Sequence, residues 1–323
     1  MFNSKMSNYP GGFANGVIIR GMPLHIVHPG HVFWVYNGTA MLTGQRGGSN
    51  GNDGSFNAPF ATVDYAISRC TASRGDIVMV KPGHSETFSA ADGFDIDIAG
   101  VAVIGLGSGS LRPKFILDTA ATADVNISAA NCTLYNVVFE AGFADIVRGV
   151  QVTAANAAII NVEFTDQAAD ENWLTPIKAT STVDNNADGL WVEGCKWYSP
   201  DAAGLEFIEF NAQIKKLVAK HNYVVHEGTT TAVLILGATG KDLLGADIQS
   251  NFISTKITSG NLFIDSDSTA STGIMAHNRV GHADVTTTHD FGGTGMGFRL
   301  FDNLSVSTAS LSGFVLPAID TDA

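Results

Sequence analysis

The most restrictive feature of this sequence is a strand-and-turn pattern that returns at a nearly constant spacing. The segments that follow each turn are NVVF at 136–139, NVEF at 161–164, CKW at 195–197, NYVV at 222–225, NFIS at 251–254, NRVG at 278–281 and NLSV at 303–306. Their large residues are Phe139, Phe164, Trp197, Tyr223, Phe252, Arg279 and Leu304, at steps of 25, 33, 26, 29, 27 and 25 residues. Because the coils of a solenoid stack equivalent residues on one another, this repeat predicts an all-β solenoid.

The later repeats each divide into three short strands. Residues 222–226, 231–237 and 241–249 form one such set before Asn251 begins the next. Three strands in 25 to 30 residues describe one coil of a solenoid. A β-sandwich also combines short strands with frequent turns, but it does not require an aromatic residue and an Asn to recur in phase.

An Asn opens four successive coils, at Asn222, Asn251, Asn278 and Asn303. Asn tolerates the left-handed backbone conformation that a tight turn between strands needs. In register, the side-chain amides can also hydrogen-bond along the column. We therefore predict that these four residues form a structural turn column.

A single convincing helix is expected at about residues 62–73. Val63, Ala66, Ile67 and Cys70 give it one apolar face, Thr62 is the candidate N-cap, and Gly75 follows as the stop. A solenoid has open ends that would expose its interior and its strand edges. The position of the helix, directly before a strand at 76–80, predicts that it caps one end.

Residues 1–48 are expected to form an N-terminal arm, separated by the Gly- and Asn-rich stretch around 43–55 from a β-helix domain at 49–323. Two apolar runs in the arm are split by Pro23 and Pro29, as in an extended segment or a small hairpin. A segment this short has little core of its own, so we expect it to bury its apolar side chains on a partner. The predicted contacts are Val17, Ile18, Ile19, Val32, Phe33, Trp34 and Val35.

Composition excludes several classes of partner. The net charge of -13 and the absence of a Lys/Arg run argue against binding to nucleic acid or an anionic bilayer. No apolar stretch is long enough for a membrane span or a signal peptide, so synthesis and folding in a host cytoplasm are expected. Cys70, Cys132 and Cys195 lie in apolar surroundings and are predicted to be buried reduced thiols.

The segment from Gly51 to Glu86 carries a specific resemblance. Its Gly-Asn-Asp, Pro59-Phe60, Ala66-Ile67, Gly75-Asp76 and Pro82-Gly83 resemble the opening segment of right-handed parallel β-helix proteins of the pectate-lyase-like class. That class includes polysaccharide lyases, hydrolases and phage virion proteins. The arm followed by one β-helix is most similar to structural proteins of tailed bacteriophages. The resemblance implies the fold strongly and the function weakly.

The residues of pectin-cleaving enzymes are missing. Where a Trp-x-Asp-His strand would be sought, the sequence reads Trp191-Val192-Glu193-Gly194, and Arg112-Pro113 lacks the spacing of the catalytic Arg in the resembling lyases. The pairs Asp95/Asp97 and Asp265/Asp267 place two carboxylates about 7 Å apart on one strand face, a spacing that glycoside hydrolysis can use. We favour a solvated outer face, because 31 acidic residues spread over many strands form such pairs by chance. His25, His28 and His31 are the densest His cluster, but no Cys or acidic residue completes a metal set.

These observations predict a non-enzymatic phage virion protein with no cofactor. It is expected to be a capsid decoration or cement protein that is held by its arm on other virion proteins, chiefly the major capsid protein, and forms a homotrimer. The alternative is a tail-associated receptor-binding protein or tailspike that contacts, and cleaves, a host surface polysaccharide. A free polysaccharide lyase is a third reading.

Overall fold

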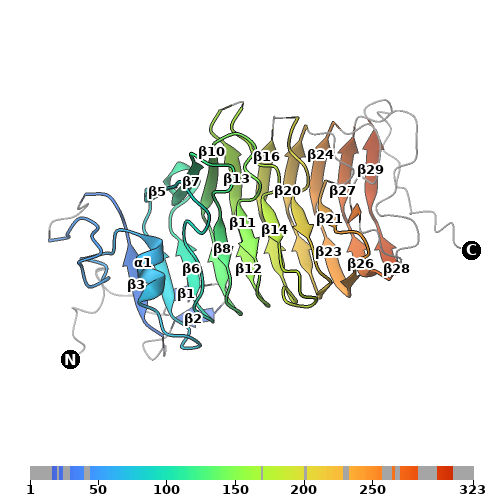
Figure 1. Cartoon of the computed structure of the whole chain (residues 1–323). Coiled ribbons are helices and arrows are strands. Elements are labelled where there is room, and N and C mark those ends of the chain that lie inside the picture. Colours follow the sequence, from blue (N-terminus) through green and yellow to red (C-terminus); the bar gives the residue numbers. More distant parts are fainter. Residues whose placement is uncertain are drawn as a thin grey trace, which may run out of the picture.

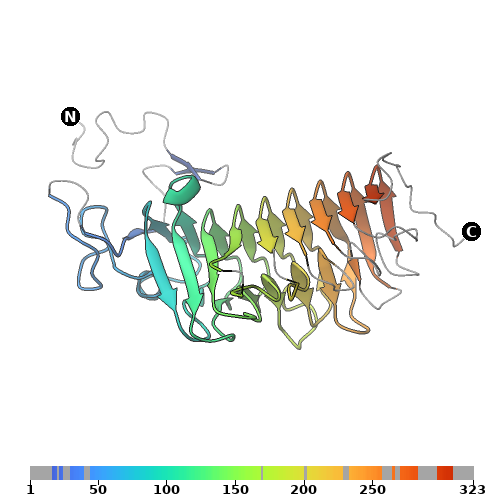
Figure 2. The ribbon, with the colours of Figure 1, turned by 90° about the horizontal axis from the view of Figure 1, so that it is seen from above.

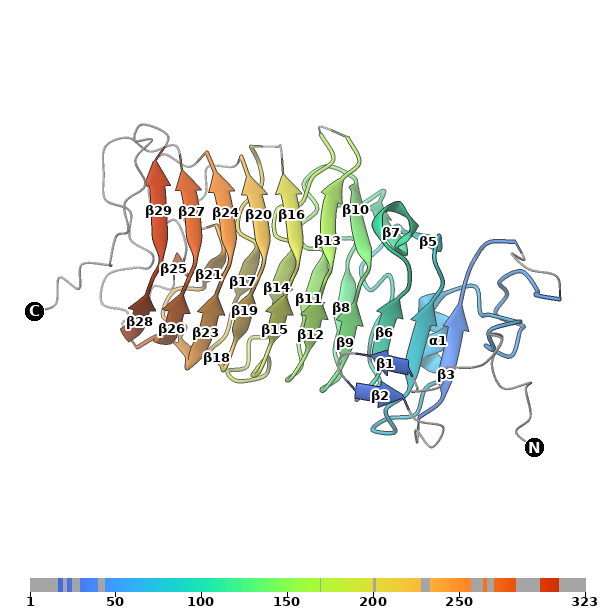
Figure 3. The same cartoon turned by 180° about the vertical axis from the view of Figure 1, so that it is seen from behind.

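The body of the protein is a parallel β-solenoid, as predicted (Figure 1). This computed structural model describes residues 17–19, 22–24, 30–39, 44–168, 170–199, 202–227, 233–256, 264–265, 270–282 and 297–307. Each complete coil adds one parallel strand to each of three sheets, and the coil is right-handed (Figure 3). The β-sandwich alternative is therefore wrong.

The sheets contain ten, nine and six strands. The ten-stranded sheet contains β3 (Val32–Val35), β4 (Ile77–Val80), β6 (Ala102–Gly105), β9 (Thr133–Tyr135), β12 (Ala158–Ile160), β15 (Trp191–Glu193), β19 (Val218–Lys220), β23 (Ala246–Gln249), β26 (Thr272–Ala276) and β28 (Gly297–Phe301). The nine-stranded sheet contains β5 (Ser85–Phe88), β7 (Lys114–Asp118), β10 (Val138–Gly142), β13 (Glu163–Asp166), β16 (Lys196–Ser199), β20 (Tyr223–His226), β24 (Phe252–Thr255), β27 (Arg279–His282) and β29 (Leu304–Ser307).

The six-stranded sheet contains β8 (Val125–Ile127), β11 (Val150–Val152), β14 (Ile177–Ala179), β17 (Ile208–Phe210), β21 (Ile235–Gly237) and β25 (Ile264–Asp265). Two short pairs accompany these sheets: β18 (Ile214–Lys215) with β22 (Leu243–Leu244), and the antiparallel β1 (Val17–Ile19) with β2 (Met22–Leu24). The helical elements in the described residues are α1 (Val63–Ser68) and the 3₁₀ turn η1 (Gly109–Leu111). Seen from above, successive coils lie side by side along one axis (Figure 2).

The interior is a stack of large side chains. Phe115, Phe139, Phe164 and Trp197 are paired in register on the nine-stranded sheet and fully buried. The ring centroids of Phe115 and Phe139 are 5.7 Å apart, and those of Phe139 and Phe164 are 5.6 Å apart. Like residues therefore stack on like through four coils, which is the packing that the repeat predicts.

Beyond Trp197 the predicted alignment slips by one residue. Trp197 pairs with Val224, while Tyr223 pairs with Lys196 and is 46% exposed. Phe252, Arg279 and Leu304 continue the outward column of Tyr223. Because side chains alternate between the two faces of a strand, a shift of one residue exchanges interior for exterior. The predicted column of large residues is thus two columns on opposite faces.

Helix α1 caps the N-terminal end of the solenoid but is shorter than predicted. It runs from Val63 to Ser68, and the Thr62 side chain accepts a hydrogen bond from the Tyr65 amide as the N-cap. Its buried Val63, Ala66 and Ile67 join the same core as Val78 and Val80 of β4. The left-handed φ angles of Ser73 (57°) and Gly75 (80°) are incompatible with a helix that continues to residue 73.

The strand edges at the same end are also covered. The Trp34 amide donates to the Gly54 carbonyl and the Phe60 amide donates to the Trp34 carbonyl, each at 2.8 Å. The loop before α1 therefore occupies the outer edge of β3, which protects a strand edge from pairing with another chain. The domain boundary predicted at residue 48 falls inside this hydrogen-bonded unit.

Candidate functional site

The predicted turn column is a ladder of buried amides. Asn222, Asn251, Asn278 and Asn303 are each at most 4% exposed. In each step the Oδ1 of one Asn accepts from both the backbone amide and the side-chain Nδ2 of the previous Asn, at 2.9 to 3.1 Å. The ladder begins at Cys195, whose amide donates to Asn222 Oδ1 at 3.0 Å. The predicted hydrogen bonding along the column is confirmed.

The predicted backbone role of these residues is wrong. The left-handed φ angles fall one position earlier, at His221 (54°), Ser250 (55°), His277 (57°) and Asp302 (47°). Each Asn instead points inward and donates its second Nδ2 hydrogen to a strand carbonyl of the previous coil, as Asn251 does to Ala219 of β19. A buried side-chain amide needs such partners, so burial and hydrogen bonding, not turn geometry, require Asn here.

The predicted partner-binding residues divide into two groups. Val32, Phe33, Trp34 and Val35 form β3, which pairs with β4, and Val35 is fully buried in the core. The prediction that these four belong to an arm is wrong, because the β3–β4 pairing makes them part of the first coil. Val17, Ile18 and Ile19 form β1, which pairs with β2 outside the three large sheets. The sequence allowed a small hairpin here, and that is confirmed.

A second apolar cluster lies on the outer face of the first coils. Ile77, Met79 and Ile104 are at most 7% exposed although their side chains point away from the interior. The β1–β2 pair is drawn on this side of the ten-stranded sheet (Figures 2 and 3). The first coils are therefore apolar on both faces of this sheet.

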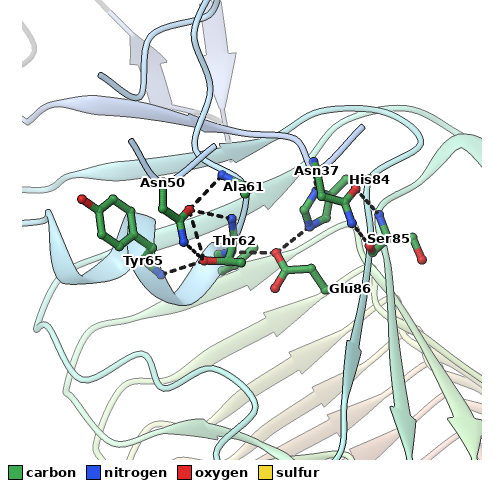
Figure 4. Close-up of polar contacts among 9 residues, drawn as sticks. Asn37, Asn50, Ala61, Thr62, Tyr65, His84, Ser85 and Glu86 are labelled. Atoms are coloured by element: carbon green, nitrogen blue, oxygen red, sulfur yellow. Dashed lines mark hydrogen bonds and ion pairs between the residues drawn. The ribbon is translucent and has the colours of Figure 1, made fainter. Parts of the chain in front are cut away.

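A polar network closes the N-terminal end beneath α1 (Figure 4). Glu86 lies in the same interior column as Phe115, and its Oε1 accepts from the Val63 amide at 2.8 Å. His84 Nδ1 accepts from the Asn37 amide at 3.1 Å, so its Nε2–H faces Glu86 Oε1 at 2.7 Å. The Asn37 side chain donates from Nδ2 to the Ser85 carbonyl and accepts at Oδ1 from the Ser85 amide. These are the two hydrogen bonds that the backbone of a neighbouring strand would otherwise make.

The buried His84–Glu86 pair has a structural role at the capped N-terminal end. Asn50 extends it by accepting from the Ala61 and Thr62 amides, which fixes the start of α1. On the other side of the helix, burial alone would raise the pKa of Asp76. Hydrogen bonds from Arg74 and from the Thr71 and His31 amides outweigh burial and lower that pKa. The network ties β3, α1 and β4 into one unit.

The carboxylates considered for glycoside hydrolysis are only partly described. Asp95 and Asp97 flank the buried Ile96, so both point outward as predicted. Burial, with smaller contributions from Asp97 and Asp92, raises the pKa of Asp95, while a hydrogen bond from Ser128 opposes the shift. Asp267 lies outside the described residues, as do His25 and His28 of the His cluster. Among the residues that the structure describes, no three His, Cys, Asp or Glu side chains gather as a metal site would require.

Glu206 is a buried carboxyl that sequence reasoning missed. Glu206 is 1% exposed, and burial raises its pKa to about 7, with the neighbouring Glu209 adding to the shift. Thr175 Oγ1 donates to Glu206 Oε1 at 2.8 Å. Its neighbour Ile208 is a core residue of the six-stranded sheet. An acidic residue directly before an apolar strand carried no signal in the sequence that it would be buried.

A slot lies on the outer face of the ten-stranded sheet. Its volume is about 540 Å³, and it lies across three coils, between Tyr135 of β9 and Trp191 of β15. Ala158 and Ile160 of β12 form its floor, and Glu193 lies at its edge. The sequence singled out Trp191 and Glu193 only as a departure from a lyase motif. Tyr135 is 56 positions before Trp191 in the sequence, so only the coiling brings them together.

Seven Lys or Arg side chains of the described residues are paired with carboxylates between coils. Lysine or arginine side chains contact carboxylates of another coil in the pairs Arg112–Glu163, Lys114–Glu140, Arg148–Asp124, Lys178–Glu209, Lys220–Asp247, Lys241–Asp184 and Lys256–Glu227. Each partly exposed pair contributes little to stability by itself. Together they favour one register between neighbouring coils.

The three thiols are free, as predicted. Cys132 and Cys195 are buried and Cys70 is partly buried. Burial raises the pKa of Cys195 and of Cys70 to about 12 in each case. A helix long and apolar enough to cross a bilayer is not found in the described part of the chain.

Comparison with known proteins adds one structural similarity. No protein family and no curated protein matches the sequence. The solved structure of a rhamnogalacturonan lyase is similar, with a TM-score of 0.49 and 12% sequence identity over 78% of this chain and 74% of that chain. At this identity the similarity concerns the fold alone.

Proposed function

We propose that this protein is a non-enzymatic structural component of a tailed-phage particle, as a decoration or cement protein on the capsid. The observation that carries the proposal is that polar side chains of one coil form hydrogen bonds and ion pairs with the next coil. The Asn ladder uses its amides between coils, and Lys178 and Lys220 pair with carboxylates of the next coil. A body built in this way suits a rigid element of an assembly. The sequence resemblance to phage structural proteins supports the same role.

Attachment is proposed for the segment that precedes β3. Since β3 is part of the first coil, the anchoring residues narrow from 1–48 to those before about residue 29. Val17, Ile18 and Ile19 are the apolar residues of that segment which we expect to contact other virion proteins, chiefly the major capsid protein. A homotrimer remains our expectation for the assembled form.

The first experiment locates the protein. Purified particles are analysed by mass spectrometry, and the copy number of this chain is compared with that of the major capsid protein. Hundreds of copies per particle are expected for a capsid component. A few copies would place it in the tail, and absence from particles would contradict the proposal.

A second experiment tests the anchor. A variant lacking residues 1–28 keeps β3 and should retain the circular dichroism spectrum of the body, but it should no longer co-sediment with particles that lack the protein. A full-length variant with Val17, Ile18 and Ile19 changed to Ser should also lose binding. Undiminished binding of both variants would refute attachment through this segment.

The second candidate is a tail-associated receptor-binding protein or tailspike. The slot between Tyr135 and Trp191 favours it, because aromatic side chains flanking a carboxylate suit a glycan. Incubation with host capsule or lipopolysaccharide, followed by measurement of new reducing ends, would detect a cleaving spike. Binding without cleavage would indicate a receptor-binding protein.

A further inference from the structure

The slot on the ten-stranded sheet has the construction of a small binding site. In the register of this sheet Tyr135, Ile160 and Glu193 form one outward column, and Ala158 and Trp191 belong to the next. Ala158 is the small residue directly beside Trp191. Its short side chain leaves space in the slot next to the indole ring. The volume of about 540 Å³ is within the range of ligand sites in proteins.

The distance between the aromatic walls suits a ring. Tyr135 and Trp191 are two coils apart and in neighbouring outward columns. Their backbones are therefore about 12 Å apart, at a strand spacing of about 4.8 Å and a rise of about 6.6 Å for two residues. A ring in van der Waals contact with both walls needs about 3.5–4.0 Å on each side. The apolar face of a saturated sugar ring can therefore lie between the two aromatic side chains, above Ala158.

The polar edge of the slot consists of an oriented hydrogen-bond acceptor. Trp191 Nε1 donates to Glu193 Oε2 at 2.8 Å, and His221 Nδ1 lies 3.3 Å from Glu193 Oε1. Each carboxylate oxygen has a further lone pair, so Glu193 can still accept from ligand hydroxyl groups. Trp191 is 41% exposed, so its ring is available to a ligand.

The negative charge of Glu193 favours neutral sugars over sugars that carry a carboxylate. The nearest Lys on the following strand, Lys220, is held by Asp247 at 2.5 Å. Glu193 therefore faces the slot without a free lysine beside it, in a chain of net charge -13. A ligand carboxylate would be repelled, whereas hydroxyl groups would be accepted.

We propose that the slot formed by Tyr135, Ala158, Trp191 and Glu193 binds a neutral pyranose ring, stacked on the aromatic walls and held by hydroxyl donation to Glu193. This assignment does not depend on the location of the protein in a particle. It applies equally to a capsid component that contacts a glycan-coated surface.

The test uses the full-length chain and saturation-transfer NMR with defined probes. The neutral probes are the methyl pyranosides of glucose, galactose, mannose and rhamnose, and the anionic probe is methyl galacturonoside. At least one neutral probe should bind saturably, at least tenfold more tightly than the galacturonoside. Trp191→Ala should weaken that binding at least tenfold. Glu193→Gln should remove the discrimination against the galacturonoside.

The matched control is Tyr198→Ala, which removes an exposed aromatic side chain from the nine-stranded sheet and should leave binding unchanged. Circular dichroism melting curves would verify that each variant is folded. The proposal is overturned if no neutral probe binds saturably, if the galacturonoside binds as tightly as the neutral probes, or if Trp191→Ala weakens binding no more than Tyr198→Ala.

Discussion

The Asn ladder gives the sharpest prediction for stability. Asn251 occupies the middle of the column and is 1% exposed. Its side chain accepts from the amide and the Nδ2 of Asn222, and it donates to the Ala219 carbonyl and to Asn278 Oδ1. Asn251→Ala removes all of these hydrogen bonds without changing the backbone conformation that the turn requires, because the left-handed residue is Ser250.

The expected cost follows from the groups that are left without a partner. The Asn222 amide loses the partner that Asn251 supplied, whereas the Ala219 carbonyl also belongs to the ladder between β19 and β23 and keeps that pairing. Asn222 Nδ2 keeps the Val192 carbonyl, and Asn278 Oδ1 keeps the amide of residue 251. Leaving a buried donor unpaired costs about 1–3 kcal/mol, so the one unpaired amide predicts a loss of about 2 kcal/mol.

The assay combines urea unfolding with hydrogen exchange. Unfolding of a solenoid need not be two-state, so the local readout is exchange of the Asn222 amide, which should accelerate by about thirtyfold for about 2 kcal/mol. The control is Asn186→Ala, since Asn186 is exposed and makes one side-chain bond, to the Thr153 carbonyl. The control should cost less than about 1 kcal/mol. If Asn251→Ala cost no more than the control, the ladder would not be a source of stability.

Three further predictions concern the interior. Burial raises the pKa of Glu206 to about 7 in the folded protein, while in the unfolded chain this pKa is near its ordinary value of 4.5, so stability should fall as the pH rises between these two values and then level off. Glu206→Gln should flatten that part of a pH series of urea midpoints, and an unchanged slope would contradict the assignment. Cys132 and Cys195 should not react with a thiol reagent at pH 8 until urea unfolds the chain, because both are buried and have raised pKa values; labelling of either in the native state would show that the core opens. Phe164→Ala should lower the free energy of unfolding by about 3–5 kcal/mol, since Phe164 is fully buried between Phe139 and Trp173, whereas Phe143→Ala, at a side chain 37% exposed, should cost much less. Equal melting temperatures for these two variants would argue against a packed aromatic interior.

The elements predicted best from the sequence are those with a local signal. The N-cap at Thr62 and the apolar face of the helix need only a few neighbouring residues to be recognised. The period of the repeat identified the solenoid, because each coil must present the same kind of residue to the coils on either side. Local patterns and the repeat do not predict which strand pairs with which. For this reason β3 was assigned to an arm, although it pairs with β4, 45 residues further along.

The candidate site was less predictable than the fold. Trp191 and Glu193 are two positions apart on one strand and could be noticed together, but Tyr135 and Ala158 reach the slot only through the stacking of three coils. Likewise, the burial of Glu206 depends on Thr175 and Glu209, and Thr175 belongs to the previous coil.

By itself, the sequence determined that this chain coils, how long each coil is, and which amides recur in a column, because these properties repeat along the chain. Only the tertiary structure decided which face each residue occupies beyond Trp197, since a displacement of one residue in strand pairing exchanges inside for outside. It also decided that the recurrent Asn residues bond between coils while the residues before them make the turn. Register between strands is set by contacts across the whole coil, and no short stretch of sequence contains them.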